Sequence, residues 1–246
     1  MDALQPGVQK GTNMKTDRHS LNTDLSRRVS VDTQAMDWTQ SPGGHVLRKR
    51  VHLSGQAESG QVTSVVRYKA GARFPAHDHP GGEEILVLDG VFSDEHGNWP
   101  AGTYLLNPEG FRHGPFSEQG CTLFVKLRQF PGRDRKHIAM HTDNMPWIET
   151  GGGRAASKTL YTQEPYTDRT RLERWESPVD RGEITFPMGA ELFVLEGGFS
   201  DQFDSYRSQS WLRIPAGESI TPTGGRYCQV YIKEGGFPYL QPDSTL

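Results

Sequence analysis

The sequence predicts an all-β protein made of two tandem barrels, each with the double-sheet architecture of a jelly roll. Two observations lead to this prediction. Short runs rich in Val, Leu, Phe and Tyr alternate with turn-forming segments along the 246 residues, a pattern typical of barrels and jelly rolls. The chain also repeats itself once, which indicates two copies of one module.

The strands expected in the first copy are runs separated by turn residues. Val, Phe, Tyr and Leu favour the pleated, half-buried environment of a strand, and Gly, Pro, Asp and Asn favour the turns between strands. No long amphipathic helical pattern interrupts these runs. The expected strands are 62–70 (VTSVVRYKA), 83–94 (EEILVLDGVFSD), 102–108 (GTYLLNP) and 121–130 (CTLFVKLRQF).

The internal repeat divides the chain. GEEILVLDGVFSD at 82–94 matches GAELFVLEGGFSD at 189–201 without a gap, and the same offset aligns 102–110 with 209–217. A looser match joins 31–38 to 140–147. About the first dozen residues of the chain are polar and irregular, and we expect them to be disordered. The predicted regions are a polar N-terminal tail at 1–30, a metal-binding module at 31–145 and a degenerate module at 146–246.

The bulk composition excludes several classes of partner. The formal net charge is -3 and 34% of the residues are hydrophobic, so neither nucleic acid nor an anionic membrane surface is an expected partner. No apolar run approaches the roughly 18 residues of a membrane-spanning helix. The N-terminus lacks the apolar core of a signal peptide. We therefore expect a cytoplasmic protein.

The two cysteines cannot form a disulfide framework. Cys121 and Cys228 each lie in an apolar run typical of a central strand. Buried, unreactive thiols are the main expectation for both. A Cys121–Cys228 disulfide and a thiol that lines the metal cavity are the alternatives.

A first motif has the spacing of a metal site. Residues 71–90 read G-x5-H-x-H-x3-E-x6-G, with His77, His79 and Glu83 at the named positions. Residues i and i+2 of a strand face the same side, so both histidines are expected to point into the barrel. The Pro-Gly-Gly turn that follows lets the chain start a new strand at Glu83.

A second motif supplies the fourth ligand. Residues 102–113 read G-x5-P-x-G-x2-H and end on His113. Three imidazoles and one carboxylate suit Zn, Fe, Mn, Ni or Cu, whereas Ca prefers oxygen ligands alone. One such histidine by itself would more often be packed or exposed than a ligand, but the complete spacing indicates a metal. We expect one divalent transition-metal ion per chain, bound by His77, His79, Glu83 and His113.

The second module has apolar residues at the equivalent positions. At the offset that aligns Gly82 with Gly189, the four ligands correspond to Ile184, Phe186, Ala190 and Ile220. The glycines and strand residues between these positions persist. Because the module survives without the ligands, the ligands are expected to serve chemistry rather than folding. The second module is therefore predicted to bind no metal and to fill this position with core side chains.

The two motifs are those of the cupin superfamily, and the residues around them resemble one family. Residues 74–127, from FPAHDHPGGEEILVLDG to CTLFVKL, resemble the cupin domain of the ChrR anti-sigma family. Ser117 departs from the superfamily pattern, which often has Asn at this position. The resemblance implies a cupin fold, the double-stranded β-helix, in each module, and zinc at the four ligands. It covers the first module closely and the second module only as a fold.

The resemblance also bears on partners. Members of that family sense oxidative stress and hold a sigma factor inactive through a separate N-terminal helical module that has its own zinc site. Residues 1–30 contain one histidine, His19, and no cysteine, so direct binding of a sigma factor is not expected. A regulatory protein that binds a small molecule or oxidant at its metal is expected instead. Cupin pairing implies a homodimer or a monomer whose two modules pair with each other.

A second interpretation is a metal enzyme such as a non-haem dioxygenase. Many two-module cupins with one vacant module are dioxygenases or decarboxylases. Arg112 and Tyr104 are candidate helpers near His113, with Arg112 suited to a carboxylate substrate; a surface arginine beside a turn is the plainer interpretation. No acid–base pair or nucleophile can be named beside the ligands. Iron or manganese would favour the enzyme, and zinc with a closed coordination shell would favour the sensor.

Overall fold

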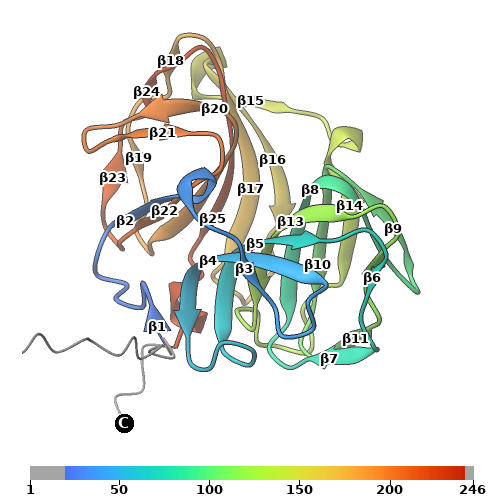
Figure 1. Cartoon of the computed structure of the whole chain (residues 1–246). Helices are drawn as coiled ribbons and strands as arrows, with labels where there is room; N and C mark the ends of the chain where they lie inside the picture. The colour runs from blue at the N-terminus through green and yellow to red at the C-terminus, as the bar shows by residue number, and fades with distance from the viewer. Residues whose placement is uncertain (1–19, 242–246) are drawn as a thin grey trace, which may run out of the picture.

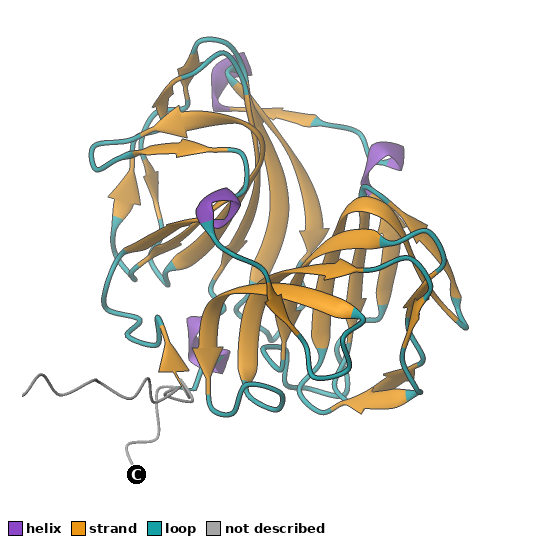
Figure 2. Ribbon diagram, viewed as in Figure 1, coloured by secondary structure: helices purple, strands orange, loops and turns teal. Residues whose placement is uncertain are grey.

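The computed structural model describes residues 20–241 and shows two β-barrels that lie side by side (Figures 1 and 2). The expected all-β architecture of two tandem barrels is confirmed. The disorder expected for the first dozen residues lies outside the described range. Helical structure in that range is limited to the short 3-10 helices η1 (Thr33–Ala35), η2 (Thr142–Asn144), η3 (Gly151–Gly153) and η4 (Phe237–Tyr239).

The first barrel is built on an 11-stranded antiparallel sheet with the order β1-β4-β5-β13-β8-β10-β14 and four further short strands. A separate two-stranded sheet, β7 with β11, closes one end. The strands are β1 (Ser20–Leu21), β3 (Thr39–Gln40), β4 (Val46–Ser54), β5 (Gln61–Tyr68), β6 (Ala72–Arg73), β7 (His77–His79), β8 (Glu83–Asp94), β9 (Gly97–Pro100), β10 (Thr103–Asn107), β11 (Phe111–His113), β12 (Phe116–Ser117), β13 (Cys121–Leu127) and β14 (Ile138–His141).

The second barrel repeats this plan with a 10-stranded sheet in the order β15-β16-β17-β25-β20-β22-β2. Its own two-stranded sheet, β19 with β23, occupies the place of β7 with β11. The strands are β2 (Val29–Asp32), β15 (Ile148–Thr150), β16 (Ala155–Tyr161), β17 (Arg169–Trp175), β18 (Val179–Asp180), β19 (Ile184–Thr185), β20 (Ala190–Ser200), β21 (Ser205–Arg207), β22 (Ser210–Ile214), β23 (Ser219–Ile220), β24 (Thr223–Gly224) and β25 (Cys228–Glu234).

Each barrel contains one strand from the other half of the repeat. β2 comes early in the chain but pairs with β22 of the second barrel, with Val31 opposite Trp211. β14 holds the equivalent place in the second half and pairs with β10 of the first barrel. Residues 29–32, which the sequence divides between the tail and the first module, therefore extend the sheet of the second barrel.

The expected strands match the observed ones closely. β8 spans Glu83–Asp94, as predicted, and β5 and β10 differ from the prediction by a residue or two at their ends. β13 ends at Leu127 rather than at residue 130. The cause is Arg128, whose φ of 60° turns the backbone out of the strand conformation.

The two barrels pack through the faces of their large sheets. Side chains from both modules form one buried apolar cluster, in which Phe124 stacks on Phe193 with ring centroids 4.3 Å apart. Buried charges lie beside this cluster. Glu84 accepts hydrogen bonds from Tyr104 at 2.6 Å and from Thr170 at 2.9 Å. Glu84 thus serves the contact between the barrels.

The repeat places an equivalent buried carboxylate in the other barrel. Glu191 forms ion pairs with Lys126 and with Arg213, the second at 2.7 Å. All three side chains are at most 4% exposed. Lys233, the equivalent of Lys126, lies 2.9 Å from Asp168 in the same layer. The inter-barrel contact therefore combines an apolar centre with two related sets of buried ion pairs.

The two cysteines lie inside the protein. Cys121 and Cys228 are buried and free, so the expectation of buried thiols is confirmed and the alternative disulfide is absent. Neither lines the cavity described below.

Among residues 20–241, no helix has the length and apolar character that a membrane crossing requires.

Candidate metal centre

The site lies where β7 and β11 close one end of the first barrel (Figure 1). The two strands run antiparallel, and His77 stands opposite His113 in their register. His79 is two residues further along β7, so it faces the same side as His77. The pairing of two short strands thus brings three histidines from distant parts of the sequence together.

A glycine turn links β7 to β8. Gly81 and Gly82 have φ values of 127° and 71°, a region that favours glycine. A Cβ atom on Gly82 would lie 2.8 Å from Cβ of Phe130 and 2.9 Å from the carbonyl oxygen of Asn107. Only glycine fits this close approach, and the turn lets β8 begin with Glu83 close to His79.

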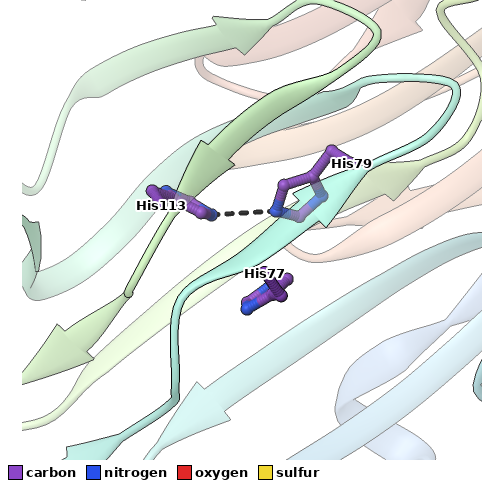
Figure 3. Close-up of side chains that lie close together, drawn as sticks. All are labelled: His77, His79 and His113. Carbon is purple, nitrogen blue, oxygen red and sulfur yellow. Dashed lines mark hydrogen bonds between the residues drawn. The ribbon is translucent and has the colours of Figure 1, made fainter.

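The three imidazoles form a compact group (Figure 3). One ligand atom from each of His77, His79 and His113 lies within 4.8 Å of the others. The Nε2 atoms of His79 and His113 are 2.9 Å apart. The Oε2 atom of Glu83 lies 3.6 Å from Nε2 of His79 and 3.4 Å from Nε2 of His113. The structure therefore brings the three predicted histidine ligands into one cluster, with Glu83 beside His79 and His113.

These separations fit a bound transition metal. Two ligand atoms that are each about 2.1 Å from one ion are separated by roughly 3.0–3.5 Å in tetrahedral or octahedral geometry. The three distances among His79, Glu83 and His113 lie in or next to this range. His77 completes the set from the exposed side of the cluster. Three nitrogens and one carboxylate oxygen form a donor set for zinc, iron, manganese or nickel.

A second layer of hydrogen bonds orients the ligands. Nδ1 of His113 contacts Oδ2 of Asp94 at 3.0 Å, and Nδ1 of His77 contacts the carbonyl oxygen of Pro75 at 2.9 Å. Both contacts leave Nε2 free for a metal. The side-chain amide of Asn107 donates to Glu83 at 3.0 Å.

Asp94 and Asn107 were not among the residues predicted from the sequence. Asp201 occupies the position equivalent to Asp94 in the second module, which lacks the histidines. The repeat therefore gives no reason to connect Asp94 with the metal site. Asn107 lies within the predicted strand 102–108, at an unspecified position of the second motif. Both residues are recognised only from their contacts with His113 and Glu83.

The environment favours different protonation of two ligands. Burial lowers the pKa of His79, and the charges of His113, His77 and Arg128 act in the same direction. Burial would also lower the pKa of His113, but the hydrogen bond to Asp94 and the carboxylate of Glu83 outweigh it and raise that pKa. A carboxylate behind an imidazole makes it a stronger metal ligand.

A cavity of about 290 Å³ extends from the site into the barrel. His77, His79 and Glu83 are among the residues that line it. Its walls are largely apolar and come from β4, β5, β8 and β13. Three arginines also line it, and the sequence analysis named none of them. These arginines are Arg48, Arg50 and Arg128.

The two predicted helper residues lie elsewhere. Arg112 is exposed and pairs with Asp78 at 3.2 Å on the outside of the two-stranded sheet. Tyr104 is fully buried between the barrels, where its hydroxyl donates to Glu84. Neither lines the cavity. The role suggested for Arg112 and Tyr104 beside a substrate is therefore not supported by their positions.

The second barrel shows the same geometry with apolar side chains. Ile184 pairs with Ile220 across β19 and β23, as His77 pairs with His113 in the first barrel. The four equivalent residues belong to the apolar core of this barrel, as expected from the repeat. These core residues are Ile184, Phe186, Ala190 and Ile220.

The sequence profile of the ChrR cupin-like domain matches residues 26–131 and again 135–238. The chain belongs to the ChrR cupin-like family. Two matches also show that both halves are copies of one family module, so the protein is a bicupin. No curated protein matches the chain.

Solved structures similar to this ChrR-like bicupin share its fold. A candidate dioxygenase from Nostoc punctiforme has a TM-score of 0.69 at 15% identity, over 84% of this chain and 82% of that chain. A bacterial pirin from Escherichia coli in complex with nickel(II) has a TM-score of 0.60 at 13% identity, over 85% and 98%. Oxalate decarboxylase from Lactobacillus farciminis, in complex with formate, has a TM-score of 0.59 at 12% identity, over 84% and 85%.

Proposed function

We propose that this ChrR-like bicupin binds one divalent transition-metal ion per chain through His77, His79, Glu83 and His113. The observation that carries the proposal is the convergence of three imidazoles within 4.8 Å of one another, with the Glu83 carboxylate 3.6 Å from His79 and 3.4 Å from His113. Zinc is the metal we propose first, because it is the metal implied by the family. Iron, manganese and nickel suit the same donor set.

We further propose that the metal centre binds a small molecule. His77, His79 and Glu83 are exposed to the cavity, so a ligand in it can reach an ion that these side chains hold. A metal in such a position acts as a Lewis acid toward an oxygen ligand. The family relationship supports a regulatory role, in which occupation of the cavity is the signal.

A metal-dependent enzyme is the second candidate function. It is favoured by the access from the cavity to the metal ligands, which a purely structural metal site does not need. A candidate dioxygenase and an oxalate decarboxylase are among the proteins with the same fold. In either role, the chain contributes apolar walls that exclude water and a fixed set of ligands.

Elemental analysis of protein purified without added metal tests the proposal. We expect about one equivalent of metal per chain in the wild type and a loss of it in His77→Ala and His79→Ala. His45→Ala is the matched control, because His45 lies outside the cluster. Wild-type protein that contains no metal and takes none up on titration would refute the proposed function.

The identity of the metal separates the two candidate roles. Iron or manganese at one equivalent would favour the enzyme, and oxygen consumption with aromatic and diketone compounds would then be measured. Zinc would favour the regulatory role, and oxidant titrations with a metal-release readout would follow. The same sample serves both measurements, so the assignment does not depend on separate preparations.

A further inference from the structure

Three arginines and three carboxylates line the cavity, but they are not all paired with one another. Glu58 forms ion pairs with Arg48 at 2.6 Å and with Arg50 at 2.9 Å, so one carboxylate serves two guanidinium groups. The third arginine of the cavity, Arg128, has no hydrogen bond or ion pair from its side chain to any residue in the described range. Asp78, a further carboxylate of the rim, is paired with an arginine outside the cavity.

Arg128 is held beside the metal centre by its backbone. Its φ of 60° is unusual for a residue other than glycine. Two hydrogen bonds fix this conformation: its amide donates to the carbonyl of Gly82 at 2.9 Å, and its carbonyl accepts from Gln61 at 2.7 Å. A strained conformation that is held in this way is often found at a functional site. Arg128 and His79 line the same cavity.

Tyr68 offers a second unpaired polar group. Its ring packs edge-on against Phe74 and Phe92, with centroids 5.5 Å and 5.8 Å away, so its orientation is fixed. Its hydroxyl has no hydrogen-bond partner among residues 20–241, although Tyr68 lines the cavity. Burial, together with the negative charge of Glu83, raises the pKa of Tyr68. The hydroxyl therefore remains protonated and can donate.

A further donor lies in the same cavity wall. Nε of Arg50 is buried and has no hydrogen-bond partner in the described part of the chain. Buried donors without a partner are rare because each reduces stability by about 1–3 kcal/mol. The remaining wall is apolar and includes Val66, Leu123 and Val125. Tyr68 and Arg128 lie toward opposite ends of β5 and β13, because Cys121 pairs with Tyr68 and Leu127 pairs with Val62. An unpaired cation and an apolar wall in one cavity are typical of a site for a small amphipathic ligand.

We infer that this cavity binds a small organic acid, with its carboxylate held by Arg128 and its apolar body against β5 and β13. The inference rests on the proposed metal centre, because the acid lies next to the metal ligands. A guanidinium group suits a carboxylate because it donates two parallel hydrogen bonds. The volume of about 290 Å³ is at the small end of ligand pockets, which excludes large cofactors.

Calorimetric titration with pairs of acids and amides tests this inference. The probes are acetate, propionate, benzoate and phenylacetate, each compared with its neutral amide, on protein of measured metal content. Acid and amide have nearly the same shape, so their difference reports the charge. We expect at least one acid to bind tenfold or more tightly than its amide. If no acid exceeds its amide, the inference is refuted.

Variants assign the binding to the named residues. Arg128→Gln is expected to weaken binding of the acid by about 10- to 100-fold, the usual effect of losing a charge-assisted hydrogen bond, and to leave amide binding unchanged. Tyr68→Phe is expected to change the affinity for the acid by less than about threefold, because Tyr68 lies at the other end of β5 from the residues beside Arg128. Arg112→Gln is the matched control, since Arg112 lies next to a predicted ligand but outside the cavity. Equal affinities for Arg128→Gln and Arg112→Gln would contradict the assignment.

The metal content of each sample separates this inference from the proposed function. Normal metal content without a preference for acids would refute the organic-acid site and leave the metal centre intact. A preference for acids that depends on Arg128 in protein unable to bind metal would refute the metal centre and retain the anion site.

Discussion

The contact between Asp94 and His113 shows how a single residue outside the ligand set controls the site. Asp94 is on the last position of β8, and its Oδ2 atom lies 3.0 Å from Nδ1 of His113. This contact fixes the proton on Nδ1 and turns Nε2 toward His79 and Glu83. The hydrogen bond from His113 also lowers the pKa of Asp94, although burial acts in the opposite direction. Asp94 is therefore a positioning residue.

Asp94→Asn is expected to lower metal affinity by about 10- to 100-fold while the fold is retained. The amide cannot stabilise the proton on Nδ1 as the carboxylate does. Competition with a chromogenic chelator measures the affinity, and circular dichroism monitors the fold. Asp201→Asn is the control from the second module, where Asp201 contacts Tyr206 instead of a histidine. Equal losses in both variants would contradict the positioning role.

The two cysteines give a second prediction at this scale. Burial raises the pKa of Cys121 to about 11 and that of Cys228 to about 12. The thiolate is the reactive form, so neither thiol is expected to react with a disulfide reagent at pH 8 in the folded protein. Both should react after denaturation. Rapid modification of either thiol in folded protein would show that the barrel interior is accessible.

At the scale of elements, β8 links the site to the fold. It begins with the proposed ligand Glu83, ends with Asp94 and pairs with β13 along the way. The register between the two strands shifts at Thr122, and Gly90 lies opposite Cys121. Gly90 has a φ of 73°, and a Cβ atom there would lie 2.2 Å from the carbonyl oxygen of Gly120. Because glycine tolerates both the positive φ and the close approach, β8 can continue from Glu83 to Asp94 and place both residues at the site.

Gly90→Ala is expected to reduce the free energy of unfolding by about 2–4 kcal/mol, because strain of the positive φ adds to a clash with the backbone. Gly71→Ala is the matched control. Gly71 has a similar φ of 75°, but a Cβ atom there meets no atom within 4 Å, so its cost is about 1–2 kcal/mol. Urea unfolding measures both. Equal losses of unfolding free energy in the two variants would show that the clash with Gly120 does not add to the strain of the positive φ.

At the scale of the whole molecule, the barrels are joined by buried charges as well as apolar packing. Burial alone would raise the pKa of Glu191, but Lys126 and Arg213 outweigh it and lower this pKa to about 2. A carboxylate whose folded pKa lies below its unfolded pKa stabilises the fold when the pH is above the unfolded value. This contribution is lost as the pH falls from the unfolded pKa toward the folded one.

Glu191→Gln is expected to reduce the free energy of unfolding by about 3–5 kcal/mol at pH 7, because Lys126 and Arg213 remain buried without a carboxylate. Its stability should also depend less on pH between about 4.5 and 2 than that of the wild type. Asp180→Asn is the control. Asp180 pairs with Arg154 on the surface, where both side chains are more than half exposed, so an effect below about 1 kcal/mol is expected. Denaturant unfolding across this pH range measures all three proteins.

The sequence was sufficient to predict those parts of the molecule that depend on local pattern. The repeat predicted two barrels, the alternation of apolar residues predicted β8, and the motif spacing placed four side chains that the structure brings together. The absence of a long amphipathic pattern agreed with the limited helical content. Each of these predictions depends on residues close together in the chain or on one repeated offset.

Features that depend on distant contacts could not be predicted in this way. Val31 of β2 lies opposite Trp211, which belongs to the other end of the chain, so nothing near Val31 indicates its partner. Arg128 enters the cavity because of its backbone conformation rather than a motif. Arg112 was a candidate because it lies beside His113 within the motif, but alternate residues of a strand face opposite sides. Its neighbour His113 points inward, so Arg112 points outward.

The exchange of β2 and β14 between the barrels bears on the ancestry of the chain. A one-module ancestor with this exchanged strand would have existed as a pair of identical subunits, each with its own set of histidines. Gene duplication and fusion would make that association intramolecular and independent of protein concentration. Each barrel is completed by a strand from its sister, so one copy could lose its histidines and still fold. In this history, one former subunit has become a permanent scaffold for the other.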